Sequence, residues 1–511
     1  MSYGHYNSLS YDMRTPSRRL QGLPGVPALI RKPLSVVLQE AGEEPLVRHL
    51  TLFDLVVIGV AGTVGSGLFA VVGLISSTYA GPAGILSWVL AGFGCIFSGL
   101  SYAELSSIMP SEGGAYTYAF VALGELPATI TAWCLTLEFG LSGAAVARVW
   151  ADKILAYVTM GAESSAYARM CVKALNPMPE LSLSPLAGVL QAVCVLILLR
   201  GLKLGKRVTT VLTAIKMAVC VFMIIAGLGL FDPKNLVPFA PTGVGGVLRA
   251  SSAAFFGYLG YDEVCAMAGE SINPRRDVPR SIGMILAIVS TSYVLAATAL
   301  SGMLPMSLQQ EDGFSFALAF LDRGWRWAGE VVAVGELVSL PVVVLASFMV
   351  QPRLLFALAN DGLVPSWLAK TNEHKVLHTA TVVSGVFMIV VAVTAPFAAL
   401  DDFTSAGVLL CAAITNSCAI MVRRSNLDPT LPGPCRPLVL LLNGLCFMAG
   451  LFLRLFTTAA TARAQRGGTV VEAAEATAAA AAALTFLVAS LVIATLVMVC
   501  PEVPFPAGGS Q

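Results

Sequence analysis

The fold is decided by the stretch Gly59-Val60-Ala61-Gly62-Thr63-Val64-Gly65-Ser66-Gly67-Leu68-Phe69, which has a counterpart at Phe255-Phe256-Gly257-Tyr258-Leu259-Gly260-Tyr261-Asp262. Each stretch lies inside an apolar run long enough for a membrane-spanning helix, which needs about 20 residues. Glycine weakens a helix by about 1 kcal/mol relative to alanine, so both helices are predicted to be interrupted there. The alternative is that the glycines form small-residue faces for helix packing.

The composition around these stretches is that of an all-α integral membrane protein. Of the 511 residues, 56% are hydrophobic and only 12% are charged, whereas a soluble chain has about 25% charged residues. The charges cluster, and the segments between the clusters have the length of spanning helices. We predict about twelve spans, near residues 51–75, 83–109, 125–151, 182–200, 208–230, 246–270, 281–304, 328–359, 378–399, 403–423, 437–457 and 477–500.

The two glycine-rich spans are the first and the sixth. Interruptions five spans apart predict a five-plus-five inverted repeat with broken helices 1 and 6 at its centre. We therefore divide the chain into a cytoplasmic tail (1–47), a transporter core of ten helices (48–425), two additional transmembrane helices (426–500) and a disordered C-terminal tail (501–511).

The distribution of basic residues predicts the orientation. Loops on the side of the N-terminus carry more Lys and Arg than those on the other side, so both termini are expected to be cytoplasmic. We expect the plasma membrane, with an internal vacuolar or lysosomal membrane as the alternative. The net charge of +1 does not indicate a nucleic-acid partner, and the oligomeric state is left open.

The sequence lacks the residues that several other classes of membrane protein require. The four histidines are His5, His49, His374 and His378, all in predicted tails or loops, so an intramembrane protease would have neither base nor zinc ligands. The eleven cysteines show no metal-binding spacing, and no phosphate-binding Gly-x-x-x-x-Gly-Lys-Ser/Thr loop occurs. We expect no enzyme, no ATP-driven pump, no metal and no cofactor.

An interruption at membrane depth frees backbone groups that need partners. The N–H groups of Gly65, Ser66 and Gly67 would begin the second half of helix 1 and suit a carboxylate.

The freed carbonyl groups suit an ammonium group. They belong to Thr63, Phe256, Gly257 and Leu259. A small solute that carries both a carboxylate and an ammonium is an α-amino acid. Phe256 is either a gate over this site or an ordinary packing residue.

Further motifs occur in order along the chain. They are Gly62-Thr63-Val64-Gly65-Ser66-Gly67-Leu68-Phe69, Tyr102-Ala103-Glu104-Leu105, Pro110-Ser111-Glu112-Gly113-Gly114-Ala115-Tyr116, Leu137-Glu138-Phe139, Asn273-Pro274-Arg275-Arg276 and Pro352-Arg353-Leu354-Leu355-Phe356-Ala357. Over residues 48–425 the sequence resembles the cationic amino acid transporter family of the amino acid–polyamine–organocation superfamily.

The resemblance implies secondary transport of arginine, lysine or ornithine by alternating access. A neutral amino acid or polyamine carrier, or a non-transporting sensor on the same fold, is the alternative. The chain departs from the family at Glu270-Ser271, where paired glutamates are usual, and at Leu340-Pro341-Val342-Val343-Val344, where a polar stretch is usual.

Three charged residues within the spans are candidates for roles in transport. Glu138 lies roughly 20 Å from either end of its helix and is expected either to bind the cationic side chain of the substrate or to pair with another helix. Lys216, where the resemblance implies a substitute for sodium, is expected to couple transport to protons or to serve as a static structural cation. Glu104, near the cytoplasmic end of span 2, is expected to form a structural or gating ion pair.

Overall fold

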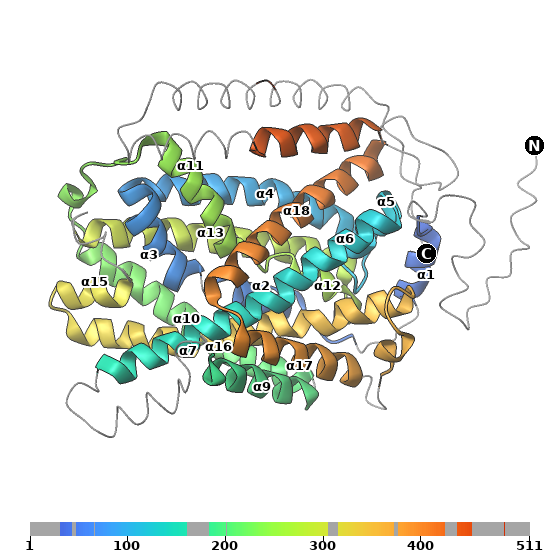
Figure 1. The fold of residues 1–511 in the computed structure, drawn as a ribbon, viewed down its shortest axis with the longest axis horizontal. Coiled ribbons are helices and arrows are strands. Elements are labelled where there is room, and N and C mark those ends of the chain that lie inside the picture. The colour runs from blue at the N-terminus through green and yellow to red at the C-terminus, as the bar shows by residue number, and fades with distance from the viewer. Residues whose placement is uncertain are drawn as a thin grey trace, which may run out of the picture.

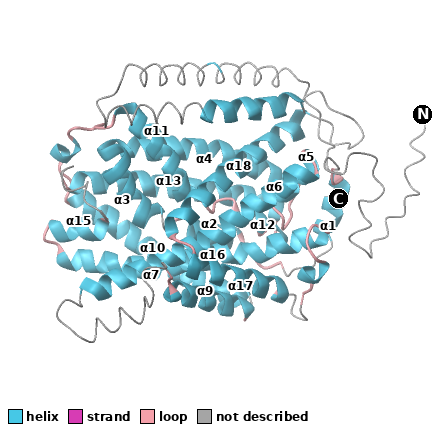
Figure 2. Cartoon of the chain, in the orientation of Figure 1, coloured by secondary structure: helices cyan, strands magenta, loops and turns pink. Residues whose placement is uncertain are grey.

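The computed structural model describes residues 31–42, 48–65, 67–160, 183–200, 202–304, 315–371, 377–424 and 437–451, together with Thr485. Within these ranges the regular structure is helical, apart from one isolated bridge between Leu50 and Ser271, as Figure 2 shows. The predicted all-α class is confirmed. Ser66, the C-terminal tail and all of the last predicted span except Thr485 lie outside the described residues.

The helices of the first half follow the predicted spans closely. They are α1 (Leu34–Gly42), α2 (Leu52–Thr63), η3 (Gly67–Val71), α3 (Val72–Leu74), η4 (Ile75–Ala80), η5 (Gly81–Ala83), α4 (Gly84–Ile108), α5 (Ala115–Ala122), α6 (Glu125–Thr136), η6 (Leu137–Leu141), α7 (Ser142–Met160), α9 (Pro185–Leu199) and α10 (Leu202–Gly229).

The second half contains a second set of helices, which includes several short turns. They are η8 (Pro233–Leu236), α11 (Gly243–Ala254), η9 (Phe255–Tyr258), α12 (Glu263–Ala266), η10 (Ala268–Glu270), α13 (Pro274–Met303), α15 (Phe316–Asp322), α16 (Arg326–Asn360), η11 (Ser366–Ala369), α17 (His378–Thr394) and α18 (Phe397–Arg424), followed by a helix over Pro437–Leu451.

The helices have the lengths and surfaces of membrane spans. Among the described residues, six helices are long and apolar enough to cross a membrane, and three shorter apolar helices accompany them. One face of α4 presents an exposed apolar stripe at helical spacing, formed by Leu86, Leu90, Phe93, Phe97 and Leu100. Charged side chains within the spans, such as Lys216 and Glu138, are buried inside the bundle. Long apolar helices with apolar outer faces and buried charges are those of an integral membrane protein.

The structure differs from the sequence prediction at some boundaries. Helix α13 begins at Pro274, before the predicted start at residue 281, because proline is well suited to the first turn of a helix. Two short helices, α5 and α15, occupy segments that were predicted as loops. Helix α16 continues through Pro341 and Pro352.

Long helices pack in pairs that are distant in sequence. Helix α4 runs along α13, α9 lies against α17, and α7 packs on α16, as can be followed in Figure 1. The segments around α2 and α12 lie at the centre of this bundle, in contact with α10, α13 and α16.

Candidate functional site

The first interruption follows α2. The helix begins with a capping box in which Thr51 and Asp54 bond reciprocally, and it ends at Thr63. Val64 is extended, with φ −76° and ψ 106°, and helical structure resumes at Gly67 in a π-helical turn. The chain therefore leaves helical geometry inside the predicted glycine-rich stretch.

The second interruption separates η9 from α12. Leu259 is extended, and Gly260 has φ +107°, a conformation that L side chains rarely adopt. Two short turns stabilise the segment: the Leu259 N–H donates to the Phe256 carbonyl (3.4 Å), and the Glu263 N–H donates to the Gly260 carbonyl (3.3 Å). These turns within the segment are one of the supports of this interruption.

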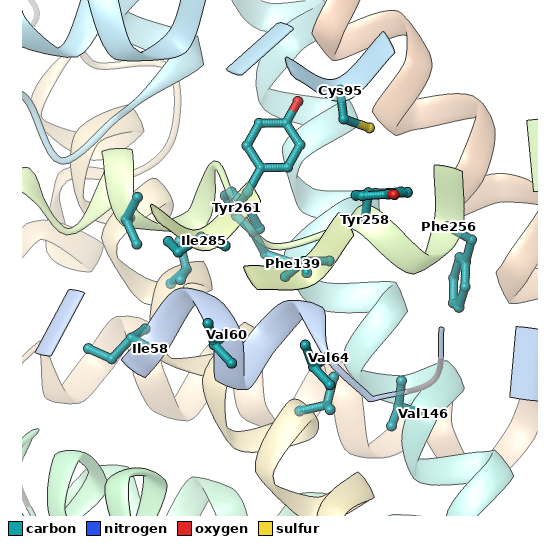
Figure 3. Packing of buried hydrophobic residues seen from close by; sticks show 14 of the residues in the cluster. Ile58, Val60, Val64, Cys95, Phe139, Val146, Phe256, Tyr258, Tyr261 and Ile285 are labelled. Carbon is teal, nitrogen blue, oxygen red and sulfur yellow. The ribbon is translucent and has the colours of Figure 1, made fainter. Parts of the chain in front are cut away.

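The two interruptions are in contact, and the glycines make this possible. A methyl group on Gly67 would lie 2.6 Å from the Cα of Gly257, and one on Gly62 would lie 2.5 Å from Oε2 of Glu263. A methyl group on Gly65 would collide with Val343 of α16. Figure 3 shows the two segments side by side. The glycines thus serve both roles considered from the sequence, interruption and close packing.

Side chains from other helices satisfy the carbonyl groups that the end of α2 leaves free. The Lys216 ammonium, on α10, donates to the carbonyl of Ala61 (2.7 Å) and lies 3.4 Å from that of Val60. The Tyr293 hydroxyl, on α13, lies 2.8 Å from the Thr63 carbonyl oxygen and 2.7 Å from the Gly257 carbonyl oxygen. A hydroxyl has one proton, so Tyr293 donates to one of these two at a time.

These contacts place the positive charge of Lys216 at the end of α2. Its side chain is fully buried. The last carbonyls of a helix carry the negative end of the helix dipole, which a cation stabilises. Lys216 therefore caps the first half of the broken helix.

The other predicted backbone positions lie in or beside the interruptions. Phe256 is buried within η9, and its carbonyl accepts the Leu259 N–H. Leu259 is half-buried on the extended segment. Ser66 falls outside the described residues, and its neighbours Gly65 and Gly67 are buried on either side of it.

Three carboxyl groups are buried beside the second interruption. Glu138 lies in the π-helical turn η6 and shares a side-chain hydrogen bond with Asp262. Glu263 accepts a hydrogen bond from the Ser347 hydroxyl on α16 (3.0 Å). Their exposed fractions are 3%, 5% and 2% for Glu138, Asp262 and Glu263.

The sequence motifs predict no role for Asp262, Glu263 or Tyr293. Two adjacent acids directly after an interrupted apolar helix were a usable signal, because ionisable residues inside a membrane are costly and usually functional. Tyr293 gave no such signal, since one tyrosine in a long apolar helix is common. Only its position opposite both interruptions distinguishes it.

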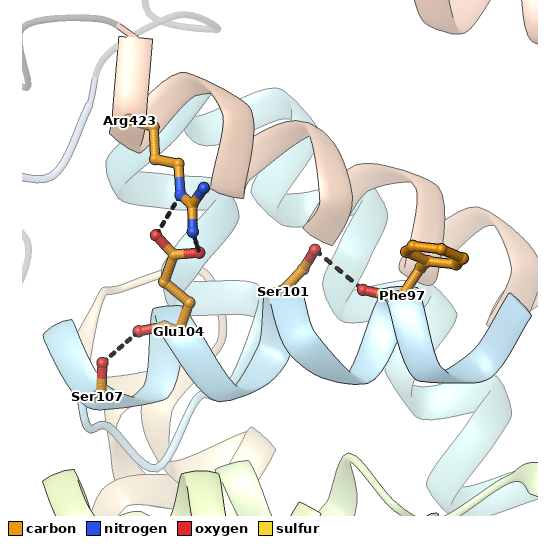
Figure 4. A network of polar contacts seen from close by, with 5 residues as sticks. All are labelled: Phe97, Ser101, Glu104, Ser107 and Arg423. Atoms are coloured by element: carbon orange, nitrogen blue, oxygen red, sulfur yellow. Dashed lines mark hydrogen bonds and ion pairs between the residues drawn. The ribbon is translucent and has the colours of Figure 1, made fainter. Parts of the chain in front are cut away.

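A polar network lies at one end of the bundle, away from the interruptions. Arg423 of α18 forms two hydrogen bonds with the Glu104 carboxylate of α4, at 2.6 and 2.7 Å, as shown in Figure 4. The pair is partly exposed, with 61% of the Arg423 side chain accessible. Glu104 thus forms an ion pair between two long helices.

A bundle of apolar helices with two interrupted helices in contact and ionisable groups buried around them is typical of a membrane transporter. The chain belongs to the amino acid permease family, whose model matches residues 50–471. The predicted family resemblance is confirmed.

The proteins to which the chain is similar are named for different substrates. The chain is 31% identical to a methylthioribose transporter of Bacillus subtilis (strain 168), over 78% of this chain and 86% of that protein. It is 30% identical to the branched-chain amino acid permease BcaP of the same organism, over 81% and 89%. It is 32% identical to cationic amino acid transporter 4 of Homo sapiens, over 81% and 67%.

Proposed function

We propose that this chain moves amino acids across its membrane by alternating access, with a preference for the cationic amino acids arginine, lysine and ornithine. The observation that carries the proposal is the contact between the two interruptions at Gly67 and Gly257, with three buried carboxyl groups nearby. An amino acid has charges that complement both the freed backbone groups and these acids.

The substrate carboxylate would bind at the start of the second half of helix 1. There the N–H groups of Gly65, Ser66 and Gly67 are assigned to it. The positive end of a half-helix dipole favours an anion, which supports this orientation.

The substrate ammonium would bind the carbonyls of Thr63, Phe256, Gly257 and Leu259. Two of these, Thr63 and Gly257, are within hydrogen-bond distance of the Tyr293 hydroxyl. An incoming ammonium would compete with Tyr293 for them. Phe256, at the edge of the second interruption, would act as the gate over the bound substrate.

The cationic side chain of the substrate would bind at Glu138. The carboxyl groups of Glu138, Asp262 and Glu263 are buried beside the second interruption, and a substrate cation would favour their charged form. The similarity to a transporter named for cationic amino acids supports the same preference. Glu138→Gln is expected to lose arginine uptake while it keeps its fold; normal arginine uptake would contradict this role.

Two further charged residues would control movement. Lys216 braces the end of α2 through the Ala61 carbonyl and is assigned a role in proton coupling. Glu104, paired with Arg423, would be part of the cytoplasmic gate.

We further propose twelve transmembrane helices, ten of them in a five-plus-five inverted repeat. A two-fold axis at the centre of a bundle brings corresponding helices together. Four of the five expected pairs do touch: α2 with α12, α4 with α13, α7 with α16, and α9 with α17. This pattern supports the division into a tail (1–47), a core (48–425), two added helices (426–500) and a C-terminal tail (501–511).

Both termini are assigned to the cytoplasm, and the plasma membrane is the proposed location, with an internal membrane as the alternative. The excess of Lys and Arg on the N-terminal side supports the orientation.

A neutral amino acid carrier is the second candidate. Val343 packs directly against Gly65 at the first interruption, which makes that side of the site apolar. The similarity to a branched-chain amino acid permease points the same way.

The test is uptake of radiolabelled arginine by proteoliposomes that contain the purified chain. Unlabelled arginine and lysine are expected to compete, and leucine and putrescine are not. Competition by leucine without lysine would favour the neutral carrier. Binding of arginine without flux would identify a sensor.

A further inference from the structure

Glu263 occupies an unusual position for an acid. It is the first residue of α12, directly after the second interruption, and only 2% of it is exposed. Its Oε2 faces the backbone of α2 at Gly62, close to the end of that helix. A negative charge near the C-terminal end of a helix is unfavourable, because the helix dipole is negative there.

Only one oxygen of this carboxyl group has a hydrogen-bond partner. Oε1 accepts from the Ser347 hydroxyl at 3.0 Å, whereas Oε2 is buried without a partner among the described residues. A buried carboxylate with an unpartnered oxygen is costly unless a nearby positive charge or a proton compensates it. Glu263 therefore needs either a nearby positive charge or a bound proton.

Lys216 brings a positive charge to the turn of α2 that Glu263 faces. Its ammonium binds the carbonyl of Ala61, and Glu263 faces the next residue, Gly62. The two side chains thus approach adjacent residues in the last turn of α2, one from α10 and one from α12.

The remaining ionisable groups around Glu263 are acids. Asp262 directly precedes it in the chain, and Glu138 on η6 shares a side-chain hydrogen bond with Asp262. Helix α16 contributes the Ser347 hydroxyl, and α2 contributes backbone. Among these groups Lys216 alone can offset a charge on Glu263, so the charge states of the two residues are linked.

We propose that Glu263 is a proton-binding residue that works together with Lys216, and that this pair links amino acid movement to proton movement. The proposal rests on the proposed transport function. In each cycle, the Glu263 carboxylate takes one proton from water on the side to which the site is open. It releases that proton to water on the opposite side, and no other group is transferred.

The experiment measures arginine uptake into proteoliposomes with and without an imposed inward proton gradient. The proteins compared are the wild type, Glu263→Gln and the matched control Glu336→Gln. Glu336 is equally buried, lies on α16 and pairs with Lys153 of α7. The gradient is expected to stimulate the wild type and Glu336→Gln several-fold, whereas the uptake of Glu263→Gln is expected to be the same with and without the gradient.

The outcomes separate the two proposals. Absence of arginine flux in the wild type overturns the transport function itself. Flux in the wild type that ignores the gradient, or equal stimulation of Glu263→Gln, overturns the role of Glu263.

If Glu263→Gln does not fold, Ser347→Ala provides the test. This variant removes the hydrogen bond to Oε1 and is expected to shift the pH at which uptake is half-maximal. An unchanged pH profile would overturn the proposal.

Discussion

The two interruptions look alike in sequence but are stabilised in different ways. The second, between η9 and α12, closes on itself with two short backbone turns and a glycine at φ +107°. The first, after α2, depends on Lys216 and Tyr293, which reach it from α10 and α13. Tyr293 reaches both interruptions, so the difference is that the second adds its own backbone turns, whereas the first takes a further partner, Lys216, from α10.

This difference has a consequence for movement. A displacement of α10 is expected to act on the end of α2 through Lys216, and a displacement of α13 is expected to act on both interruptions through Tyr293. Lys216 and Glu263, the two residues of the proposed proton link, lie where these two regions meet.

The largest effect is expected from Gly67→Val, which breaks the contact between the two regions. The added side chain would collide with the backbone at Gly257 and with Tyr293, an overpacking cost of about 3 kcal/mol or more. We expect no measurable uptake and a lower thermal unfolding temperature in detergent. Wild-type uptake in this variant would show that the interruptions are not in contact.

Lys216→Met is expected to come next. It removes the cation from the end of α2 and leaves the Ala61 carbonyl without its donor, at a cost of about 2–3 kcal/mol. Uptake and thermal stability should both fall, and the dependence on a proton gradient should disappear. An unchanged pH profile would mean that Lys216 is a static structural cation.

Tyr293→Phe tests the other support of the first interruption. The change removes a hydroxyl that serves the Thr63 and Gly257 carbonyls, at about 1–2 kcal/mol, and leaves the aromatic packing against Trp88. Because the substrate ammonium is proposed to use the same carbonyls, we expect a change in KM for arginine. A change in stability alone would mean that Tyr293 has a structural role only.

Gly260→Ala tests the role of the backbone in the second interruption. The positive φ makes alanine unfavourable by about 1–2 kcal/mol, and its methyl group would lie 3.0 Å from the Thr63 nitrogen. Thermal stability should decrease, while the dependence of uptake on a proton gradient should persist. Loss of that dependence would mean that the second interruption also responds to charge.

The smallest effect is expected from Arg423→Gln. The Glu104–Arg423 pair is partly exposed, so its loss should change stability by less than about 1 kcal/mol. Uptake at low and high salt tests its proposed role at the gate. A large loss of transport with unchanged stability would support gating. No change in either would mean that Glu104 and Arg423 form a surface ion pair without a role in gating.

Much of the architecture could be read from the chain in order. The long apolar runs predicted the helices because backbone groups in lipid must be satisfied within the segment. The glycines at 59–67 and 257–260 predicted the interruptions because local backbone preferences act over a few residues. The partners of the freed carbonyls were not predictable, since Lys216 and Tyr293 are far from α2 in sequence.

The sequence alone therefore determined the membrane class, the family and the positions of the two interruptions, all of which depend on composition and short-range preference. Only the tertiary structure decided that Gly67 meets Gly257, that Lys216 and Tyr293 cap the end of α2, and that Glu263 faces Gly62. The physical reason is distance along the chain: a buried polar group takes its partner from whichever helix packs beside it, and that choice is made by the whole bundle.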